Sequence, residues 1–482
     1  AAPDSKAAQR EARAEALRLA DAWLDAVRAY NHLPALSAAV EVGDELVWAK
    51  GYGAIDPGGK VPASSGTIYS ICSISKLFTS VAVMQQFEAG RVRLDEPVTT
   101  YLPWAKLKSV DAADSLPISL RAMLTHSAGL PRESDSPYWT GPDFLFPSRE
   151  QVRETLTRQE ALYPVGRYFQ YSNLGLTLVG ETVEAVSGEP YAAYVQAHVL
   201  GPLGLTDTHP FMPMALYEKR LAAGFGPLRR DGTRELLRPF DARGVAPAAG
   251  YTSTVEDMAR FAAWQFRLLR TGKPEVLKAS TLREMQRVQF VDPDWKTNWG
   301  LGFSITHMDR HTFVGHGGAC PGYQSALMME PATETAVVVM DNASENPDPY
   351  AAGVFALLAK RGEFKFKDPQ PAQGVNLEAY SGRYASTPWR SEGVMTPWAG
   401  GLAYLSLPTP NPADGIQVLK PKGGDVFRRV RDDGSEAEEY RFERNAAGKV
   451  TRFIHFNNPT DLIGSDSAPP AGRKSPPAKP AS

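Results

Sequence analysis

The sequence predicts an α+β protein that ends in a small all-β domain. Apolar strands stand at both ends of the main region with buried helices between them, which favours α+β over a repeating βαβ fold. Near residue 364 the composition shifts to Pro, Gln and Lys, and short strands with tight turns follow. The 482 residues are 43% hydrophobic and 10% aromatic, which excludes a disordered chain.

The N-terminal part is predicted to be a helix followed by two strands. Ala, Leu, Arg and Glu dominate residues 6–30, where Trp23 and Leu24 belong to an apolar stripe. Residues 36–42 and 45–49 then form two strands around a Gly-Asp turn.

Two further segments are apolar almost all round and end at a glycine, which is typical of buried helices with a Gly C′ residue. These predicted helices cover residues 74–89 and 174–187. Apolar strands are predicted at 325–330 and 335–341, on either side of a four-residue turn.

The C-terminal segment is predicted to be a β-barrel or sandwich of about 88 residues, with hairpins at Asp433-Gly434 and Ala447-Gly448. Tyr440, Phe442, Phe453 and Phe456 supply its apolar faces. The last 18 residues lack core formers, and we expect them to be disordered. The predicted organisation is an N-terminal helix, a main domain, a linker, a β domain and a tail, at 1–33, 34–363, 364–376, 377–464 and 465–482.

Charge and composition exclude several classes of partner. Lys and Arg number 52 and Asp and Glu 54, so the net charge of −2 gives no reason to expect nucleic acid or an anionic membrane. The sequence contains no run of 18 apolar residues, so it predicts no membrane-spanning helix. The opening Ala-Ala-Pro-Asp-Ser is typical of a chain after signal-peptide cleavage, so we expect a periplasmic or secreted protein.

The strongest chemical feature is Ser73-Ile74-Ser75-Lys76. Ser-x-x-Lys on a helix places both side chains one turn apart on one face, and burial lowers the pKa of the amine so that it can take the serine proton. The backbone N–H of Ser73, at the helix N-terminus, is a candidate oxyanion donor. Such a motif arises by chance roughly once or twice in a chain of this length, but this one opens the most buried helix.

Two other clusters carry polar chemistry. Tyr171 lies just before a buried helix, where a neighbouring ammonium would favour its phenolate, and Asn173 can bind a substrate amide. Taken alone, Ser172 or Asn173 is more simply a helix cap.

The third cluster is His316-Gly317-Gly318. Its glycines permit a ligand to approach the backbone closely, and the N–H of Ala319 is a second candidate oxyanion donor. A plain turn between strands is the simpler reading of this cluster alone.

Together the order Ser-x-x-Lys, Tyr-x-Asn, His-x-Gly resembles the serine β-lactamase and penicillin-binding-protein superfamily. The resemblance is greatest to the class C-like branch of D-aminopeptidases, DD-carboxypeptidases and family VIII esterases. It covers about residues 34 to 360. Further matching segments are LDEPVTTYLP, ISLRAMLTHSAGLP, GPLGLTDT, YTSTVEDMARF and GHGGACPGY.

The resemblance implies a DD-peptidase/β-lactamase-like fold, with a helical subdomain beside an antiparallel sheet flanked by helices. It also implies a C-terminal lipocalin-like barrel. Ser73 would be the nucleophile, Lys76 its base and Tyr171 the proton shuttle, with Ser73 and Ala319 as oxyanion donors. Asn173, His316, Gly317 and Gly318 would bind substrate. No metal or organic cofactor is implied.

The third motif departs from class C β-lactamases, which usually have Lys-Thr-Gly. His316 replaces the cation, so we expect a weaker grip on a carboxylate at neutral pH, and a stronger one near about pH 5.5 once the imidazole is protonated. We therefore expect a serine hydrolase that acts through an acyl-enzyme on an ester, amide or peptide. The alternatives are a D-amino-acid peptidase or DD-carboxypeptidase, a β-lactamase, and a non-hydrolytic penicillin or peptidoglycan-fragment sensor.

The two cysteines, Cys72 and Cys320, each neighbour a proposed oxyanion donor. A disulfide between them is conceivable in an oxidising compartment, but the sequence does not determine where their Cβ atoms point. Two cysteines exclude a disulfide-dense scaffold and a Cys-only zinc site.

Overall fold

The computed structural model describes residues 3–107, 115–308, 310–366, 375–388 and 390–464. Contacts divide the chain into two compact units, Asn31–Ala352, and Ala1–Tyr30 together with Gly353–Ser482. The predicted domain boundaries stay predictions. The predicted tail, and most of the predicted linker, lie outside the described residues.

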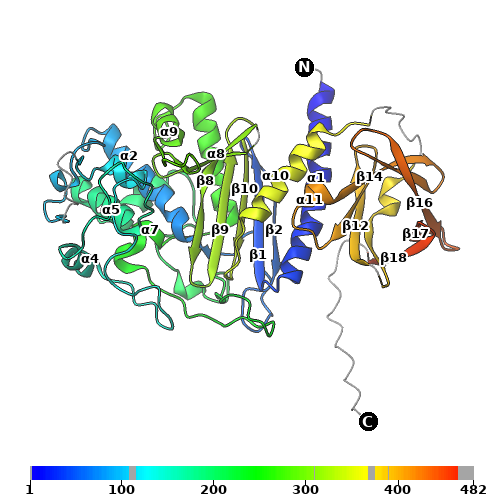
Figure 1. Ribbon diagram of the computed structural model, residues 1–482, viewed down its shortest axis with the longest axis horizontal. Coiled ribbons are helices and arrows are strands. Elements are labelled where there is room, and N and C mark those ends of the chain that lie inside the picture. The colour runs from blue at the N-terminus through cyan, green and yellow to red at the C-terminus, as the bar shows by residue number, and fades with distance from the viewer. Residues whose placement is uncertain (1–2, 108–114, 309, 367–374, 389, 465–482) are drawn as a thin grey trace, which may run out of the picture. The chain divides into compact units, whose positions relative to one another are not determined.

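The unit Asn31–Ala352 is built on an antiparallel sheet with the strand order β2-β1-β10-β9-β8-β7-β6-β5 (Figure 1). The strands around the centre are nearly all buried, which explains why their sequences read as continuous apolar runs. The eight strands are β1 (Ala35–Val42), β2 (Glu45–Gly53), β5 (Phe290–Val291), β6 (Asn298–Trp299), β7 (Ser304–Met308), β8 (His311–Cys320), β9 (Tyr323–Glu330) and β10 (Thr335–Asp341). A two-stranded ladder is formed by β3 (Tyr69–Ser70) and β4 (Thr252–Ser253).

Helices gather beside this sheet (Figure 1). At their centre α2 (Ser75–Glu88), α5 (Asn173–Ser187) and α7 (Ala246–Ala249) pack against one another, and α8 (Val255–Thr271) packs on β1 and β10. The sequence correctly predicted α2 and α5 as buried helices, and α5 ends at Gly188 in the left-handed conformation. The other helices are α3 (Leu120–Leu124), α4 (Arg149–Leu156), α6 (Tyr191–Val195) and α9 (Ala279–Gln286).

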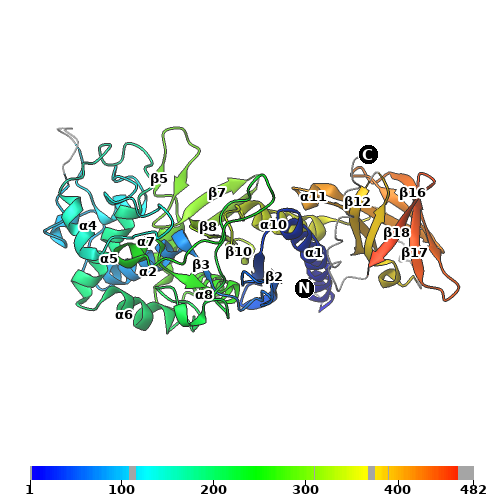
Figure 2. The same cartoon turned by 90° about the horizontal axis from the view of Figure 1, so that it is seen from below.

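The C-terminal residues form a closed barrel in which each strand pairs with the next and the last pairs with the first (Figure 2). Tyr440, Phe442 and Phe453 belong to its core, as predicted, whereas Phe456 lies at a turn and is 64% exposed. Both predicted hairpins are present. The strands are β11 (Gly382–Ser386), β12 (Arg390–Trp398), β13 (Gly401–Leu407), β14 (Ile416–Gly423), β15 (Val426–Val430), β16 (Glu436–Arg444), β17 (Val450–His455) and β18 (Asn458–Gly464). The predicted α+β fold with a C-terminal barrel is therefore confirmed.

The first helix, α1 (Pro3–Tyr30), belongs to the same unit as the barrel. Trp23 is fully buried and donates its indole N–H to the carbonyl of Thr409 at 2.9 Å. Glu15 pairs with Arg361 of α10 (Asp348–Glu363) and accepts the N–H of Ala399 at 2.9 Å. A short α11 (Pro412–Gly415) completes the helices of this unit that the structure describes.

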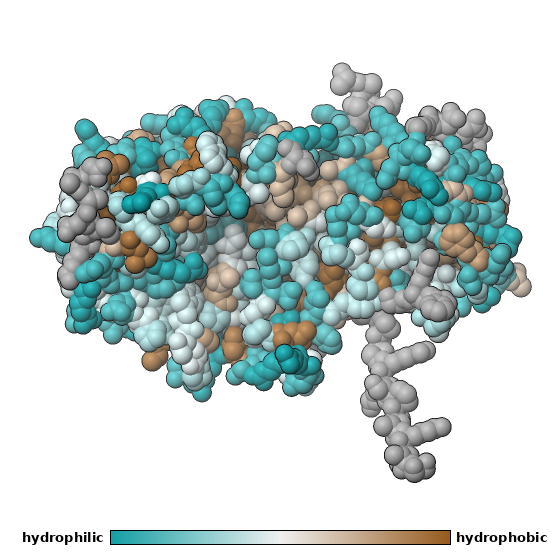
Figure 3. Space-filling model, in the orientation of Figure 1, coloured by the Kyte–Doolittle hydropathy of each residue, from teal (hydrophilic) through white to brown (hydrophobic). Residues whose placement is uncertain are grey.

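Hydrophilic residues cover most of the face seen in Figure 3, with hydrophobic residues scattered between them. In the part of the chain that the structure describes, no helix is long and apolar enough to cross a membrane.

Candidate active site

Ser73 lies in a short 3-10 turn, Cys72–Ile74, which leads directly into α2. Cys72 has a φ of 49°, a left-handed conformation that non-glycine residues rarely adopt and that is often retained at functional sites. Lys76 stands one turn further along α2, so the local helix brings its side chain toward Ser73.

Strands β8 and β9 pack against this turn. A Cβ atom at Gly318 would lie 2.2 Å from the carbonyl oxygen of Ile71, so only glycine lets β8 approach the chain that carries Ser73. We expected the glycines to admit a ligand. At Gly318 the close neighbour is instead the protein's own backbone, whereas a Cβ at Gly317 would meet nothing nearer than 3.7 Å.

Lys76 is completely buried and its Nζ has three polar neighbours. It donates to Asn173 Oδ1 at 2.7 Å and to the carbonyl oxygen of Ala248 at 2.8 Å. The third neighbour is Ser73 Oγ at 3.0 Å. The carbonyl and amide oxygens can only accept hydrogen bonds, so they take two of the amine's N–H groups.

Glu133 orients Asn173. The side-chain amide of Asn173 donates to Glu133 Oε1 at 2.8 Å, and a carboxylate only accepts, so the amide oxygen must face Lys76. The other carboxylate oxygen of Glu133 accepts the hydroxyl of Tyr138. Glu133 therefore fixes the direction of one hydrogen bond that Lys76 donates.

Burial holds the pKa of Lys76 well below its ordinary value, while the charge of Glu133 opposes this shift and that of Arg132 adds to it. This agrees with the sequence-based expectation that a buried helix would lower the pKa. A neutral amine keeps a lone pair, and with two N–H groups taken by Asn173 and Ala248 the lone pair remains for the Ser73 hydroxyl.

Tyr171 lies beside both groups. Lys76 Nζ lies 4.8 Å from the centre of its ring, and Ser73 is close enough to act on the pKa of its hydroxyl. We expected Tyr171 to lose its proton readily. Burial instead raises the pKa of Tyr171, and the lowering effects of the Ser73 side chain and of the Arg132 charge do not outweigh it. The expectation was wrong because it assumed a lysine with its ordinary pKa and took no account of burial, which lowers the pKa of Lys76 and raises that of Tyr171.

Aromatic side chains surround Tyr171. His126 stacks on its ring with 4.2 Å between centroids, and Trp299 meets both rings edge-on. The Nδ1 atom of His126 accepts the backbone N–H of Ser172 at 3.0 Å, which ties the segment of Tyr171 to the loop after α3. Burial keeps the pKa of His126 well below its ordinary value, so this imidazole is neutral.

His316 also faces this cluster, with its ring 6.1 Å from that of Tyr171. Burial lowers the pKa of His316 to about 3, the charge of Lys76 acts in the same direction, and a hydrogen bond to the carbonyl of Gly317 opposes it. The expectation that His316 becomes a cation near about pH 5.5 was therefore wrong. Sequence reasoning applied the pKa of an exposed imidazole to a buried one.

We therefore expect the KM of an anionic substrate to stay within about twofold between about pH 7.5 and pH 5.5, because His316 gains no charge in that interval. Steady-state kinetics with a fixed anionic substrate at both pH values measure this. His316→Asn removes the titrating group and should have the same flat KM profile. A wild-type KM that falls on acidification, with no such fall in His316→Asn, would contradict the assignment.

Cys72 and Cys320 form a disulfide, with 5.7 Å between their Cα atoms. The bond joins the residue before Ser73 to the residue after Ala319. It brings the two proposed oxyanion donors into the same part of the fold, although their role as donors stays a prediction. Ala319 itself pairs in register with Gln324 of β9.

A thiol count should detect no free cysteine in the purified protein. The measurement uses a thiol reagent on denatured, non-reduced protein, and reduction before the assay should release two thiols, from Cys72 and Cys320. Two free thiols without reduction would contradict the disulfide.

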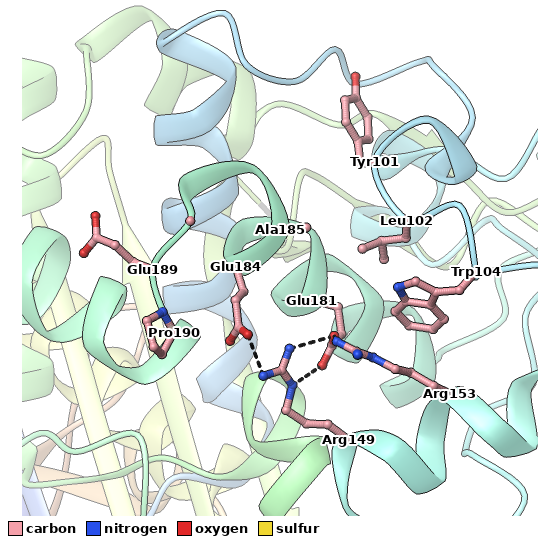
Figure 4. Close-up of a pocket in the computed structure, with 11 residues that line it drawn as sticks. Tyr101, Leu102, Trp104, Arg149, Arg153, Glu181, Glu184, Ala185, Glu189 and Pro190 are labelled. Atoms are coloured by element: carbon pink, nitrogen blue, oxygen red, sulfur yellow. Dashed lines mark hydrogen bonds and ion pairs between the residues drawn. The ribbon is translucent and has the colours of Figure 1, made fainter.

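A pocket of about 340 Å³ lies elsewhere on the helical side (Figure 4), and none of the predicted site residues lines it. Arg149 forms ion pairs with Glu181 and Glu184, each at 2.6 Å, and Arg153 also pairs with Glu181. Burial alone would raise the pKa of Glu181, but the two arginines outweigh it and hold the pKa below its ordinary value. Because these charges satisfy one another, we interpret the cluster as structural.

The sequence profile of the beta-lactamase family matches residues 20–361, and the chain belongs to that family.

Three proteins illustrate what this chain is similar to. Beta-lactamase-like protein 2 of Dictyostelium discoideum is 26% identical over 305 residues, which are 62% of this chain and 54% of the relative. The D-alanyl-D-alanine-carboxypeptidase/endopeptidase AmpH of Escherichia coli is 28% identical over 190 residues, 39% of this chain and 49% of the relative. The chain thus spans about half the length of both relatives. The octameric penicillin-binding protein homologue from Pyrococcus abyssi has the same fold, with a TM-score of 0.61, 23% identity, and coverage of 90% of this chain and 97% of that one.

Sequence reasoning found Ser73, Lys76, Tyr171, Asn173 and His316, and the structure brings all five together. The sequence analysis missed Glu133, Arg132 and the backbone carbonyl of Ala248. The one signal in the sequence is that Arg132 and Glu133 directly follow ISLRAMLTHSAGLP, a segment that carries the family resemblance.

Proposed function

We propose that this protein is a serine hydrolase that forms an acyl-enzyme on Ser73 with an ester, amide or peptide substrate. The observation that carries the proposal is the environment of Lys76 Nζ. Two acceptors, Asn173 Oδ1 and Ala248 O, occupy its N–H groups, and Ser73 Oγ lies 3.0 Å away. This geometry supports Lys76 as the base that activates Ser73.

In the proposed acylation step, Ser73 Oγ attacks the substrate carbonyl carbon while its proton moves to Lys76. The proton then passes through Tyr171 to the leaving group, whose bond to the carbonyl carbon breaks. Because the pKa of Tyr171 is raised, we propose that Tyr171 gives up its own proton as it receives another, and never accumulates as phenolate. In deacylation, water gives a proton to the same unit and attacks the acyl carbon, the bond from that carbon to Ser73 Oγ breaks, and Ser73 Oγ takes the proton back as the acid leaves. The N–H groups of Ser73 and Ala319 are the proposed oxyanion donors.

The substrate class remains a proposal. The names of similar proteins include a D-alanyl-D-alanine carboxypeptidase/endopeptidase and a D-amino acid amidase. Since His316 provides a neutral imidazole where class C β-lactamases usually have a lysine, we favour esters, amides and peptides over β-lactams.

We further propose that the protein works in an oxidising compartment, such as a periplasm or the extracellular medium. The Cys72–Cys320 disulfide supports this, because structural disulfides are rare in reducing cytosol.

A substrate panel tests the proposed function. It consists of p-nitrophenyl acetate and butyrate, D-Ala-p-nitroanilide, a D-Ala-D-Ala peptide and nitrocefin. Turnover of at least one ester, amide or peptide is expected, with nitrocefin the poorest substrate. Stoichiometric labelling by a penicillin without turnover of any substrate would favour the sensor alternative.

A further inference from the structure

Arg132 is an exposed cation beside the proposed proton relay. Its side chain is 61% exposed, and its guanidinium carbon lies 4.9 Å from the centre of the Tyr171 ring. The main chain holds it there, since the carbonyl oxygen of Arg132 accepts the backbone N–H of Asn173 at 2.8 Å. The backbone at Arg132 is thus anchored to a site residue while its side chain stays in reach of solvent.

Only some of the N–H groups of the Arg132 guanidinium have a partner among the described residues. Its Nε lies 3.3 Å from Glu133 Oε1, but both oxygens of Glu133 already accept hydrogen bonds, from Asn173 and Tyr138. Among the described residues, no hydrogen bond engages either Nη atom of Arg132. A planar fork of N–H groups therefore remains available to an acceptor from outside.

Among the described residues whose charge acts on Tyr171, Arg132 is the exposed cation. Lys76 is buried with its pKa well below the ordinary value, and His316 stays neutral above about pH 3. The charged side chains that act on Lys76 and Tyr171 are Arg132 and Glu133, and Glu133 is committed to orienting Asn173. An anionic group on a substrate at Tyr171 would meet Arg132.

We propose that Arg132 binds a carboxylate on the leaving group of the substrate. This inference rests on the proposed function, in which Tyr171 hands the proton to the leaving group, so that a guanidinium over the Tyr171 ring lies on the leaving-group side. The proposed substrates are therefore esters, amides or peptides whose leaving group carries a carboxylate. The fork of Arg132 matches the two carboxylate oxygens, which a lysine would hold only as a point charge.

The test compares phenyl acetate with 3-carboxyphenyl acetate, which form the same acetyl-enzyme and differ only in the charge of the leaving group. The measured quantity is the ratio of kcat/KM for the charged ester to that for the neutral ester. In Arg132→Gln this ratio should fall about ten- to one-hundredfold, the usual effect of losing a hydrogen bond to a charged group. Any effect of Arg132 on Tyr171 itself acts on both esters and cancels.

Arg167→Gln is the matched control. Arg167 is another exposed arginine stacked on a tyrosine, 5.3 Å from the centre of the Tyr168 ring, so its loss changes the net charge equally. We expect the ratio to change less than about twofold in this variant and to be partly retained in Arg132→Lys. A 4-nitrophenyl hydrogen succinate substrate, with its carboxylate on the acyl side, should respond less to Arg132→Gln than the 3-carboxyphenyl ester.

Three results would overturn the proposal. An unchanged ratio in Arg132→Gln would show that Arg132 does not meet the leaving group. An equal fall in Arg167→Gln would show a general effect of charge. If the wild type hydrolyses neither these esters nor any member of the substrate panel, the proposed function fails and the inference falls with it. Hydrolysis of the esters that depends on Ser73, with an unresponsive ratio, defeats the inference alone.

Discussion

Ser73→Ala should lower kcat for a small ester by about 10³-fold or more, because it removes the atom that forms the acyl-enzyme. Its Oγ lies 3.0 Å from the buried amine of Lys76. A fluorophosphonate should label the wild type once, and peptide mapping of the adduct should locate it on Ser73. Label on another residue, or turnover unaffected by the substitution, would contradict the assignment.

Ser80→Ala is the control for this experiment. Ser80 lies on the same helix, one turn beyond Lys76, and its hydroxyl donates to the carbonyl of Lys76 at 2.7 Å. It is as buried as its neighbours but does not contact Ser73 through any hydrogen bond described in the structure. The labelling of Ser73 should persist in this variant, which separates loss of the nucleophile from general damage to α2.

Lys76→Met and Tyr171→Phe should each lower kcat/KM by about 10²- to 10⁴-fold, the range for removal of a general acid or base. The double variant should lose far less than the product of the two single losses, because both residues move the same proton. Methionine nearly matches the volume of the lysine it replaces, so the buried site keeps its packing. Losses that multiply would show that the two side chains act separately.

The same pair predicts a pH dependence. The base must be unprotonated, so activity should fall as pH drops through the lowered pKa of Lys76, and it should stay high at neutral pH, where an ordinary lysine would be charged. The acidic limb of the kcat/KM profile should disappear from the residual activity of Lys76→Met. An acidic limb that persists unchanged in this variant would assign it to another group.

Local sequence predicted much of the fold because the relevant forces act between near neighbours. Apolar residues all round 74–89 and 174–187 predicted α2 and α5, and the change in pattern after residue 364 predicted the barrel. Ser73 lies in the 3-10 turn that leads into α2 and Lys76 lies in the first turn of α2, three residues later, so their encounter follows from local helical geometry. Tyr171 and His316 were candidates with simpler readings on their own, and only the resemblance joined them to Ser73, since 98 and 145 residues separate the three motifs.

The sequence by itself determined the elements, the nucleophile and the amine beside it, because helix period and hydrophobic pattern act within a few residues. Only the tertiary structure decided the charge of each group, the Cys72–Cys320 pairing, and the placement of Arg132 and Glu133. A pKa depends on how completely the whole fold removes water and which charges it brings close, and no local pattern encodes that. For this reason His316 was expected to become a cation and is neutral, while the exposed charge at the site belongs to an arginine that no motif marked.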